Sequence, residues 1–334
     1  MNQKQIVFSL LTVVIIGGFL IGNEVFNQEE ENVSSAYAEQ ITVLEGDIFR
    51  INNTSPPSQL TRTQDVEIVF SNYKDFLLVG KGVRIPTYSD EPQYTTLYLL
   101  NSDGTEIRKV TEQQIEYALL SPIGDYIFYL TANGDIFKQD TNSGQEEQMT
   151  SFATSFTISP DGSYLSFLKL PTEWTPGEMG WETKGITILD TLTKEEALLT
   201  TSELDHLAYW TPDSSRLLVS GGTNDGNGAI FIVDSDGDNR TQLTATSEWH
   251  YYDNELIPIL STQPIISADG RIIIYEADQS IWMLELDLEK RSLIQAKRIA
   301  YGKNLQWVET GKIFSLQSSD KTLILMNTEG QVVR

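Results

Sequence analysis

The sequence predicts an all-β fold, a β-propeller of four-stranded antiparallel blades preceded by an N-terminal transmembrane or signal helix. Three observations predict it. An uncharged apolar run opens the chain, a strand–turn–strand pattern recurs along the rest, and a second hairpin pattern alternates with the first. Joined together, the two patterns make a unit of about 40 to 55 residues, the size of one propeller blade.

The apolar run extends from Ile6 to Gly22, after Lys4 and before Glu24. As a helix rising about 1.5 Å per residue it would measure about 25 Å, near the lower limit for crossing a bilayer. Positive charge before the run and negative charge after it predict an inside N-terminus and an extracytoplasmic chain. We therefore expect a signal-anchor helix at 1–22.

The segment 23–40 is acidic, polar and poor in aromatic residues, which is typical of a flexible tether. It also contains Ala36-Tyr37-Ala38, which has the small-x-small form of a signal-peptide cleavage site. Two outcomes stay open: a single-pass protein of the cell membrane, or a protein that is secreted or periplasmic after cleavage near Ala38. Both outcomes export the domain at 41–334.

Charge and cysteine content exclude several functions. The chain has 23 Lys+Arg against 47 Asp+Glu, a net charge of −24, so its surface repels nucleic-acid phosphates and anionic lipid headgroups. It has no cysteine, which excludes disulfides, thiolate catalysis, cysteine-based zinc sites and lipid attachment through cysteine. An exported chain without cysteine is typical of a bacterial cell envelope.

The first repeat is a short apolar strand, a tight turn and a second apolar strand. Pro, Asp and Gly in the turn supply the backbone angles that such a turn needs. Clear copies occupy 120–130, 158–168, 210–220 and 266–276, and weaker copies occupy 70–79 and 307–316.

The second repeat is a hairpin of two alternating strands that closes in Leu-Thr or a similar pair. Five copies start at Ile48, Leu97, Ile136, Ile186 and Ile230, and two more start at Ile281 and Leu323. In the first five, a threonine follows about 13 or 14 residues after the start. The copies predict seven blades over 41–334, the first (41–62) without its inner strand. A six-bladed ring with an N-terminal closing hairpin is the alternative.

The combination of a Ser-Pro-Asp-Gly strand pair with an Ile-Phe hairpin closing in Leu-Thr resembles the WD40-like (PD40) repeat of TolB-type and prolyl oligopeptidase propellers. The resemblance covers roughly 41–334. It implies the fold and says little about function. In contrast to TolB, we expect no additional N-terminal α/β domain, for which 1–40 leaves no room, and we expect no hydrolase domain of the prolyl oligopeptidase kind.

Loop length distinguishes the two faces of the predicted propeller. Because strands alternate in direction, the a–b and c–d turns leave one face of a blade and the b–c and d–a connections leave the other. The long segments 81–94, 169–184, 221–228 and 245–263 all belong to the second face. Insertions grouped on one face often mark a binding surface. The predicted partner-binding residues on it are Tyr88, Trp174, Glu178, Trp181, Trp249, His250, Tyr251, Tyr252 and Asp253.

Asp234, Asp236 and Asp238 stand at every second position, as acidic residues do at the start of a calcium-binding loop. However, glycine stands at the fourth position instead of the sixth, and no glutamate follows at the twelfth. The three residues also lie in a predicted c–d turn, which Asp and Gly explain without a metal. We expect no metal and no cofactor; if calcium binds, it binds here.

No phosphate loop, dinucleotide fingerprint or Gly-x-Ser-x-Gly element occurs, and the chain has two histidines, so no motif indicates an enzyme. We expect a protein- or glycan-binding or scaffolding module of the cell envelope that acts through the long-loop face. The alternative is a hydrolase or lyase with a carboxylate site at the central channel.

Overall fold

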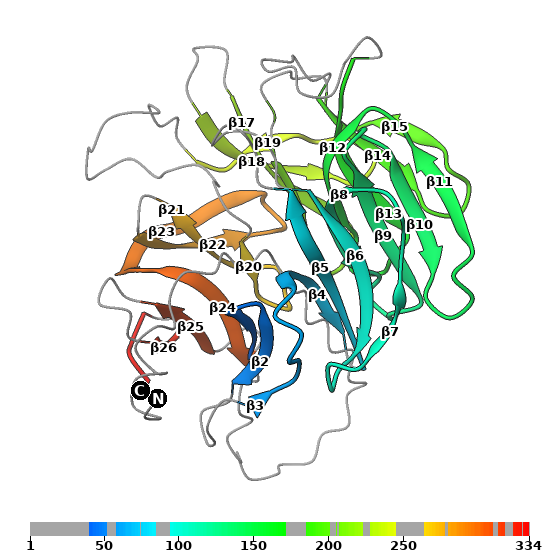
Figure 1. Ribbon diagram of the computed structural model, residues 1–334. Helices are drawn as coiled ribbons and strands as arrows, with labels where there is room; N and C mark the ends of the chain where they lie inside the picture. The colour runs from blue at the N-terminus through cyan, green and yellow to red at the C-terminus, as the bar shows by residue number, and fades with distance from the viewer. Residues whose placement is uncertain are drawn as a thin grey trace, which may run out of the picture. The chain divides into compact units, whose positions relative to one another are not determined.

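The computed structural model describes residues 40–51, 58–73, 75–84, 94–171, 185–200, 205, 207–222, 228–244, 264–277, 280–309, 313–317, 323–328 and 330–333 (Figure 1). Within these ranges every helix or strand is a β-strand, so the all-β prediction is confirmed. The described part of the chain contains no helix able to cross a membrane. The predicted helix at 1–22 and the tether up to residue 39 lie outside the described residues.

The described strands fall into two compact units. Unit 1 runs to Ala132 and also takes in Lys138–Glu147, and unit 2 comprises Asn133–Phe137 and the chain from Gln148 onward. The boundary therefore passes through two neighbouring strands, β10 (Ile136–Asp140) and β11 (Glu146–Thr150).

Unit 1 begins with a three-stranded antiparallel sheet in the order β1-β2-β3. A larger sheet follows in the order β11-β10-β9-β8-β6-β5-β4, with β7 beside β6. A single residue pair, Thr95 and Ile115, joins β6 to β8, so this sheet is two antiparallel groups, β4–β7 and β8–β11. The strands not yet bounded are β1 (Gln40–Leu44), β2 (Asp47–Ile51), β3 (Ser58–Gln59), β4 (Val66–Tyr73), β5 (Phe76–Arg84), β6 (Tyr94–Asn101), β7 (Glu106–Lys109), β8 (Ile115–Leu120) and β9 (Tyr126–Thr131).

Unit 2 contains four antiparallel sheets whose strands follow chain order: β12–β15, β16–β19, β20–β23 and β24–β26. The first is β12 (Ala153–Ile158), β13 (Tyr164–Lys169), β14 (Ile186–Asp190) and β15 (Glu196–Leu198); the second is β16 (Leu207–Trp210), β17 (Arg216–Gly222), β18 (Gly228–Asp234) and β19 (Thr241–Gln242). The third is β20 (Ile265–Ile266), β21 (Ile272–Ala277), β22 (Ser280–Asp287) and β23 (Ser292–Tyr301); the last is β24 (Lys303–Glu309), β25 (Ile313–Gln317) and β26 (Leu323–Asn327).

Both sequence repeats form the predicted strand pairs. The first repeat builds β8–β9, β12–β13, β16–β17 and β20–β21, and its weaker copies build β4–β5 and β24–β25. The second repeat builds the pairs that begin with β2, β6, β10, β14, β18 and β22, whereas its copy at Leu323 forms β26 with no later strand beside it among the described residues. Alternation of side chains across each strand therefore sets the register.

In unit 2 the sheets pack face to face in chain order. One buried cluster joins Ile188 of β14 to Leu217 and Phe231 of the next sheet, and another joins Ile232 of β18 to Tyr275 of β21. A third cluster joins β20–β23 to β24–β26. The middle strands of β16–β19 and β20–β23 are apolar on both sides because each of these two sheets is covered on both faces. In β18, for example, Ala229 to Val233 are at most 4% exposed.

The Leu-Thr ending has a physical cause that recurs between sheets. Leu199 and Leu243 are buried, and the hydroxyl of the following threonine accepts a hydrogen bond from the backbone N–H at the start of the neighbouring strand. Thr200 bonds Ile186 N at 3.1 Å and Thr244 bonds Ile230 N at 2.9 Å. Each threonine thus supplies a partner to a buried amide that the short last strand cannot reach.

Candidate functional site

The predicted partner-binding residues Tyr88, Trp174, Glu178, Trp181, Trp249, His250, Tyr251, Tyr252 and Asp253 all lie outside the described residues. What the structure describes is the strand ends that flank these segments. The sequence predicts that those strand ends lie on one side of the sheets.

The tight turns between first and second strands share one hydrogen-bonded design. In three turns of unit 2 a Ser or Thr hydroxyl donates to an Asp two residues later and accepts from the backbone N–H five residues later. Burial acts to raise the pKa of these carboxyls, but the hydrogen bonds outweigh it and hold each pKa below its usual value. The aspartates are Asp161, Asp213 and Asp269.

The turn between third and fourth strands lies beside the first tight turn in each of these sheets. Thr191 N donates to Ser163 O at 2.9 Å and Ser235 N to Ser215 O at 3.0 Å. In the third sheet Leu286 N, near the end of β22 and just before its turn, donates to Arg271 O at 2.8 Å. Both kinds of tight turn therefore leave the same edge of their sheet, as antiparallel pairing requires.

Contacts between turns of successive sheets show that the tight turns of three sheets in unit 2 lie on the same side. Asp161 N donates to Ser214 Oγ at 3.1 Å, which ties the first turn of β12–β15 to that of β16–β19. Arg291, in the turn after β22, binds Asp234, at the end of β18. The segments after β13, β17 and β19 consequently all leave the opposite side. We call this side, marked by Pro171, Gly222 and Thr244, the long-connection end.

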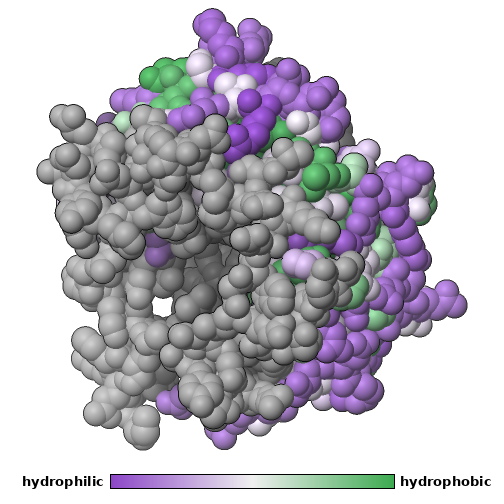
Figure 2. Space-filling model, turned by 90° about the horizontal axis from the view of Figure 1, so that it is seen from above, coloured by the Kyte–Doolittle hydropathy of each residue, from purple (hydrophilic) through white to green (hydrophobic). Residues whose placement is uncertain are grey.

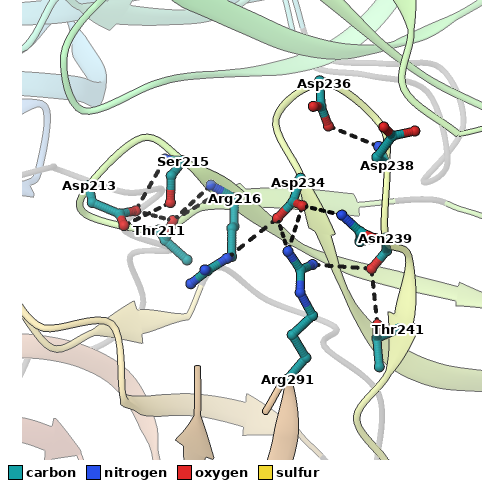
Figure 3. A network of polar contacts seen from close by, with 10 residues as sticks. All are labelled: Thr211, Asp213, Ser215, Arg216, Asp234, Asp236, Asp238, Asn239, Thr241 and Arg291. Atoms are coloured by element: carbon teal, nitrogen blue, oxygen red, sulfur yellow. Dashed lines mark hydrogen bonds and ion pairs between the residues drawn. The ribbon is translucent and has the colours of Figure 1, made fainter. Parts of the chain in front are cut away.

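The three aspartates that resemble the start of a calcium loop, Asp234, Asp236 and Asp238, make different contacts (Figure 3). Arg291 Nη2 lies 2.5 Å from each oxygen of Asp234, Asn239 Nδ2 donates to Asp234 at 2.8 Å, and Arg216 Nε lies 3.4 Å away. Burial acts to raise the pKa of Asp234, but these partners outweigh it and lower the pKa.

Asp236 instead accepts a hydrogen bond from the backbone N–H of Asp238 at 3.0 Å, a turn contact in which Asp238 uses its main chain (Figure 3). In the described ranges, no three His, Cys, Asp or Glu side chains form a group that could hold a metal ion. In this structure the carboxylate of Asp234 therefore serves as an ion-pair link between two sheets.

At the long-connection end of β16–β19 lies a buried ion pair that the sequence analysis did not single out. Asp205 is fully buried and accepts a hydrogen bond from Arg240 at 2.8 Å. The Arg240 guanidinium lies 3.5 Å from the ring centre of Phe231. A Cβ on Gly221 would overlap an oxygen of Asp205, so glycine is needed there. Asp205 lies two residues before β16, and an acidic residue so close to an apolar first strand is a signal that could have marked it.

The second oxygen of Asp205 has no hydrogen-bond partner among the residues that the structure describes. A buried carboxylate with an open acceptor position is costly unless something outside those residues satisfies it. The neighbouring sheet carries a further polar group at this end, where Lys169 binds Glu196 and Thr150. Charged groups therefore border the long connections on two successive sheets.

Unit 1 contains a carboxyl group, Glu116, whose pKa is raised, in contrast to the turn aspartates of unit 2. Glu116 lies in β8 where the pairing with β9 shifts between Ile115 and Tyr117. Burial alone raises the pKa of Glu116, and no ion pair or hydrogen bond from a described residue offsets it. A raised pKa keeps this carboxyl group protonated to a higher pH than an exposed glutamate, as a general acid requires.

The exposed surface is mainly polar. In the view of Figure 2 the described residues are mainly hydrophilic, with separate hydrophobic areas. A single large apolar patch is not seen among the described residues of this face.

No protein-family model matches the chain, and no curated protein matches it significantly in sequence. Solved structures match its fold. Oligogalacturonate lyase in complex with manganese aligns with a TM-score of 0.59 and 14% identity, over 89% of this chain and 84% of that one. Dipeptidyl peptidase 4 of Porphyromonas gingivalis aligns with a TM-score of 0.57 and 12% identity, over 90% and 51%.

TolB from Acinetobacter baumannii is also similar, with a TM-score of 0.48 and 16% identity over 89% of this chain and 78% of that one. The lyase has a TolB-like β-propeller fold, so the predicted TolB-type propeller fold is confirmed. At these identities the likeness shows the fold and leaves function open.

Proposed function

We propose that the chain is an extracytoplasmic β-propeller that recognises a protein or glycan partner through its long-connection end. In this proposal it has seven blades and is held at the membrane by 1–22, or is released by cleavage near Ala38. One observation carries the proposal: the tight turns of three successive sheets in unit 2 lie on the same side. This supports a single opposite side for the connections after β13, β17 and β19.

The chemistry of these connections supports recognition. Their sequences bring together Trp174, Trp181, Trp249 and His250 with several carboxylates. Aromatic rings with carboxylates suit a basic peptide, a sugar or a cationic ligand. Asp205 and Lys169 add described charges at the strand ends that border the same connections.

The test is cross-linking in the native envelope, with the captured partners identified and then compared between variants. One variant removes 172–184 and keeps Gly185; another shortens 245–263 to two residues, the number that joins β11 to β12. Both keep Thr244 and the buried Pro264, so the sheets retain their anchoring contacts. We expect both variants to lose the partner.

The control changes the opposite side. Leu192 is 86% exposed in the tight turn after β14, and Leu192→Ser should leave capture unchanged. Capture that survives both shortened variants but is lost in the turn variant would overturn the proposal.

A second function is supported by Glu116. A desolvated carboxyl group without a described partner suits a general acid or base, as a hydrolase or lyase requires. Because a lyase of oligogalacturonate shares the fold, that polymer is the first substrate to try. The assay compares the full chain with Glu116→Gln over a panel of glycans. Activity that Glu116→Gln abolishes would favour this function, and an inactive full chain would count against it.

A further inference from the structure

The outermost strand of the third sheet in unit 2 differs from its counterparts. β23 has ten residues, whereas the last strands of the two preceding sheets, β15 and β19, have three and two. Among the described strands β23 pairs with β22 alone, so one row of its backbone groups has no strand partner there. Figure 1 shows it as a long arrow at the margin of its sheet.

Apolar side chains are exposed along this edge. Both faces of the sheet are covered, since Leu293 and Ala296 pack toward β16–β19 while Ile299 and Ala300 pack toward β24–β26. Yet Ile294 is 53% exposed and Tyr301 is 63% exposed. Ile294 lies where the register with β22 shifts, so it is placed outside the regular alternation of the faces.

The same stretch is basic in an acidic chain. Residues 290–303 contain five basic residues and no acidic one, although the whole chain has 47 Asp+Glu against 23 Lys+Arg. Lys290 pairs with Asp287 and Arg291 with Asp234. Farther along, Arg298 is exposed and its guanidinium lies 4.7 Å from the ring centre of Tyr301. Charge and apolar surface thus occur together on one long edge.

We propose that β23 is a docking edge for an extended, acidic segment of a partner protein, which adds to the sheet as a further strand. Open N–H and C=O groups supply the pairing, Arg298 faces carboxylates, and Ile294 and Tyr301 cover apolar side chains of the added strand. Like charge disfavours pairing with β23 of a second copy, so the basic residues select for an acidic strand. This surface is separate from the long-connection end and does not depend on the function proposed there.

The experiment measures binding of the full chain to a fluorescent ten-residue peptide that alternates glutamate with valine. We expect saturable binding that weakens about tenfold in Arg298→Glu, the effect of about two exposed ion-pair interactions. Ile294→Asp should weaken it as well. The matched control is Lys194→Glu, the same change of charge in the exposed turn before β15. Circular dichroism checks that each variant is folded.

Backbone pairing is tested separately with the same peptide N-methylated along both edges, which keeps its charge and removes its hydrogen-bond donors. We expect this peptide not to bind. Equal binding of the two peptides, no binding of either, or equal weakening by Lys194→Glu would overturn the proposal. Self-association of the chain that Arg298→Glu abolishes would assign the edge to a second copy instead.

Discussion

Arg291 holds both carboxylate oxygens of Asp234 at 2.5 Å and so joins the turn after β22 to the end of β18. It does this from a backbone φ of 51°, in the left-handed region that non-glycine residues seldom adopt. Its guanidinium also donates to Asn239 O at 3.2 Å. One side chain thereby fixes the relative position of two sheets in unit 2.

Arg291→Gln should lower the free energy of unfolding by about 2 kcal/mol, because charge-assisted hydrogen bonds between two partly buried groups are lost. Urea unfolding followed by tryptophan fluorescence measures this. The neighbouring Lys290 also pairs with an aspartate, but its side chain is 79% exposed. Lys290→Gln should therefore be neutral, and a similar loss in both variants would contradict the prediction.

Thr244→Val should cost about 1 to 2 kcal/mol, since the buried N–H of Ile230 would lose its acceptor while side-chain volume stays nearly constant. The same measurement applies. Thr241→Val, three residues earlier, removes a hydroxyl bonded to Asn239 O near the exposed turn and should change stability by less than about 0.5 kcal/mol. Equal effects would mean that the closing threonine has no special role.

Gly185→Ala should destabilise by more than about 2 kcal/mol, because a Cβ there would overlap the carbonyl oxygen of Thr200 and φ is 97°. Gly82 is the control. It too has positive φ, at 68°, but its Cβ would meet open space, so Gly82→Ala should cost about 1 kcal/mol. Thermal unfolding of both variants separates steric overlap from backbone strain.

Asp205 and Arg240 should be energetically coupled. Asp205→Ala leaves the Arg240 guanidinium without its anion and should cost about 2 to 3 kcal/mol. In a double-mutant cycle with Arg240→Met we expect the double variant to lose less than the sum of the single losses, by about 1 kcal/mol or more. Strict additivity would show that the pair contributes nothing beyond its separate side chains.

Glu116→Gln should be more stable than the parent chain at neutral pH. Burial raises the folded-state pKa of Glu116 above its ordinary 4.5, so the ionised form disfavours the folded state. Well below pH 4.5 the group is protonated in both states and the penalty is absent. The penalty grows as pH rises above about 4.5, where the unfolded state loses its proton first, and it levels off above the folded-state pKa. Unfolding curves from pH 4 to pH 8 should show the two proteins diverging, and parallel curves would contradict the prediction.

The fold followed from the sequence because its determinants are local. The Ser-Pro-Asp-Gly turns, the period-two alternation and the Leu-Thr endings each act within a few residues, and they specified strand pairs such as β12–β13 correctly. For the candidate site, only the side of unit 2 from which the connections leave was tested. The side from which the long connections leave was predictable from strand alternation, whereas the residues predicted to bind a partner, such as Trp249, lie outside the described structure.

The sequence by itself determined the class of fold, the strand order and the acidic character of the surface, since these depend on neighbours in the chain and on composition. Tertiary structure alone decided which charges meet. Asp205 and Arg240 are 35 residues apart and Asp234 and Arg291 are 57 apart, so no local pattern predicts either pair. It also decided that the basic stretch at 290–303 contains the long open edge β23, because strand length and exposure depend on which sheets cover a strand.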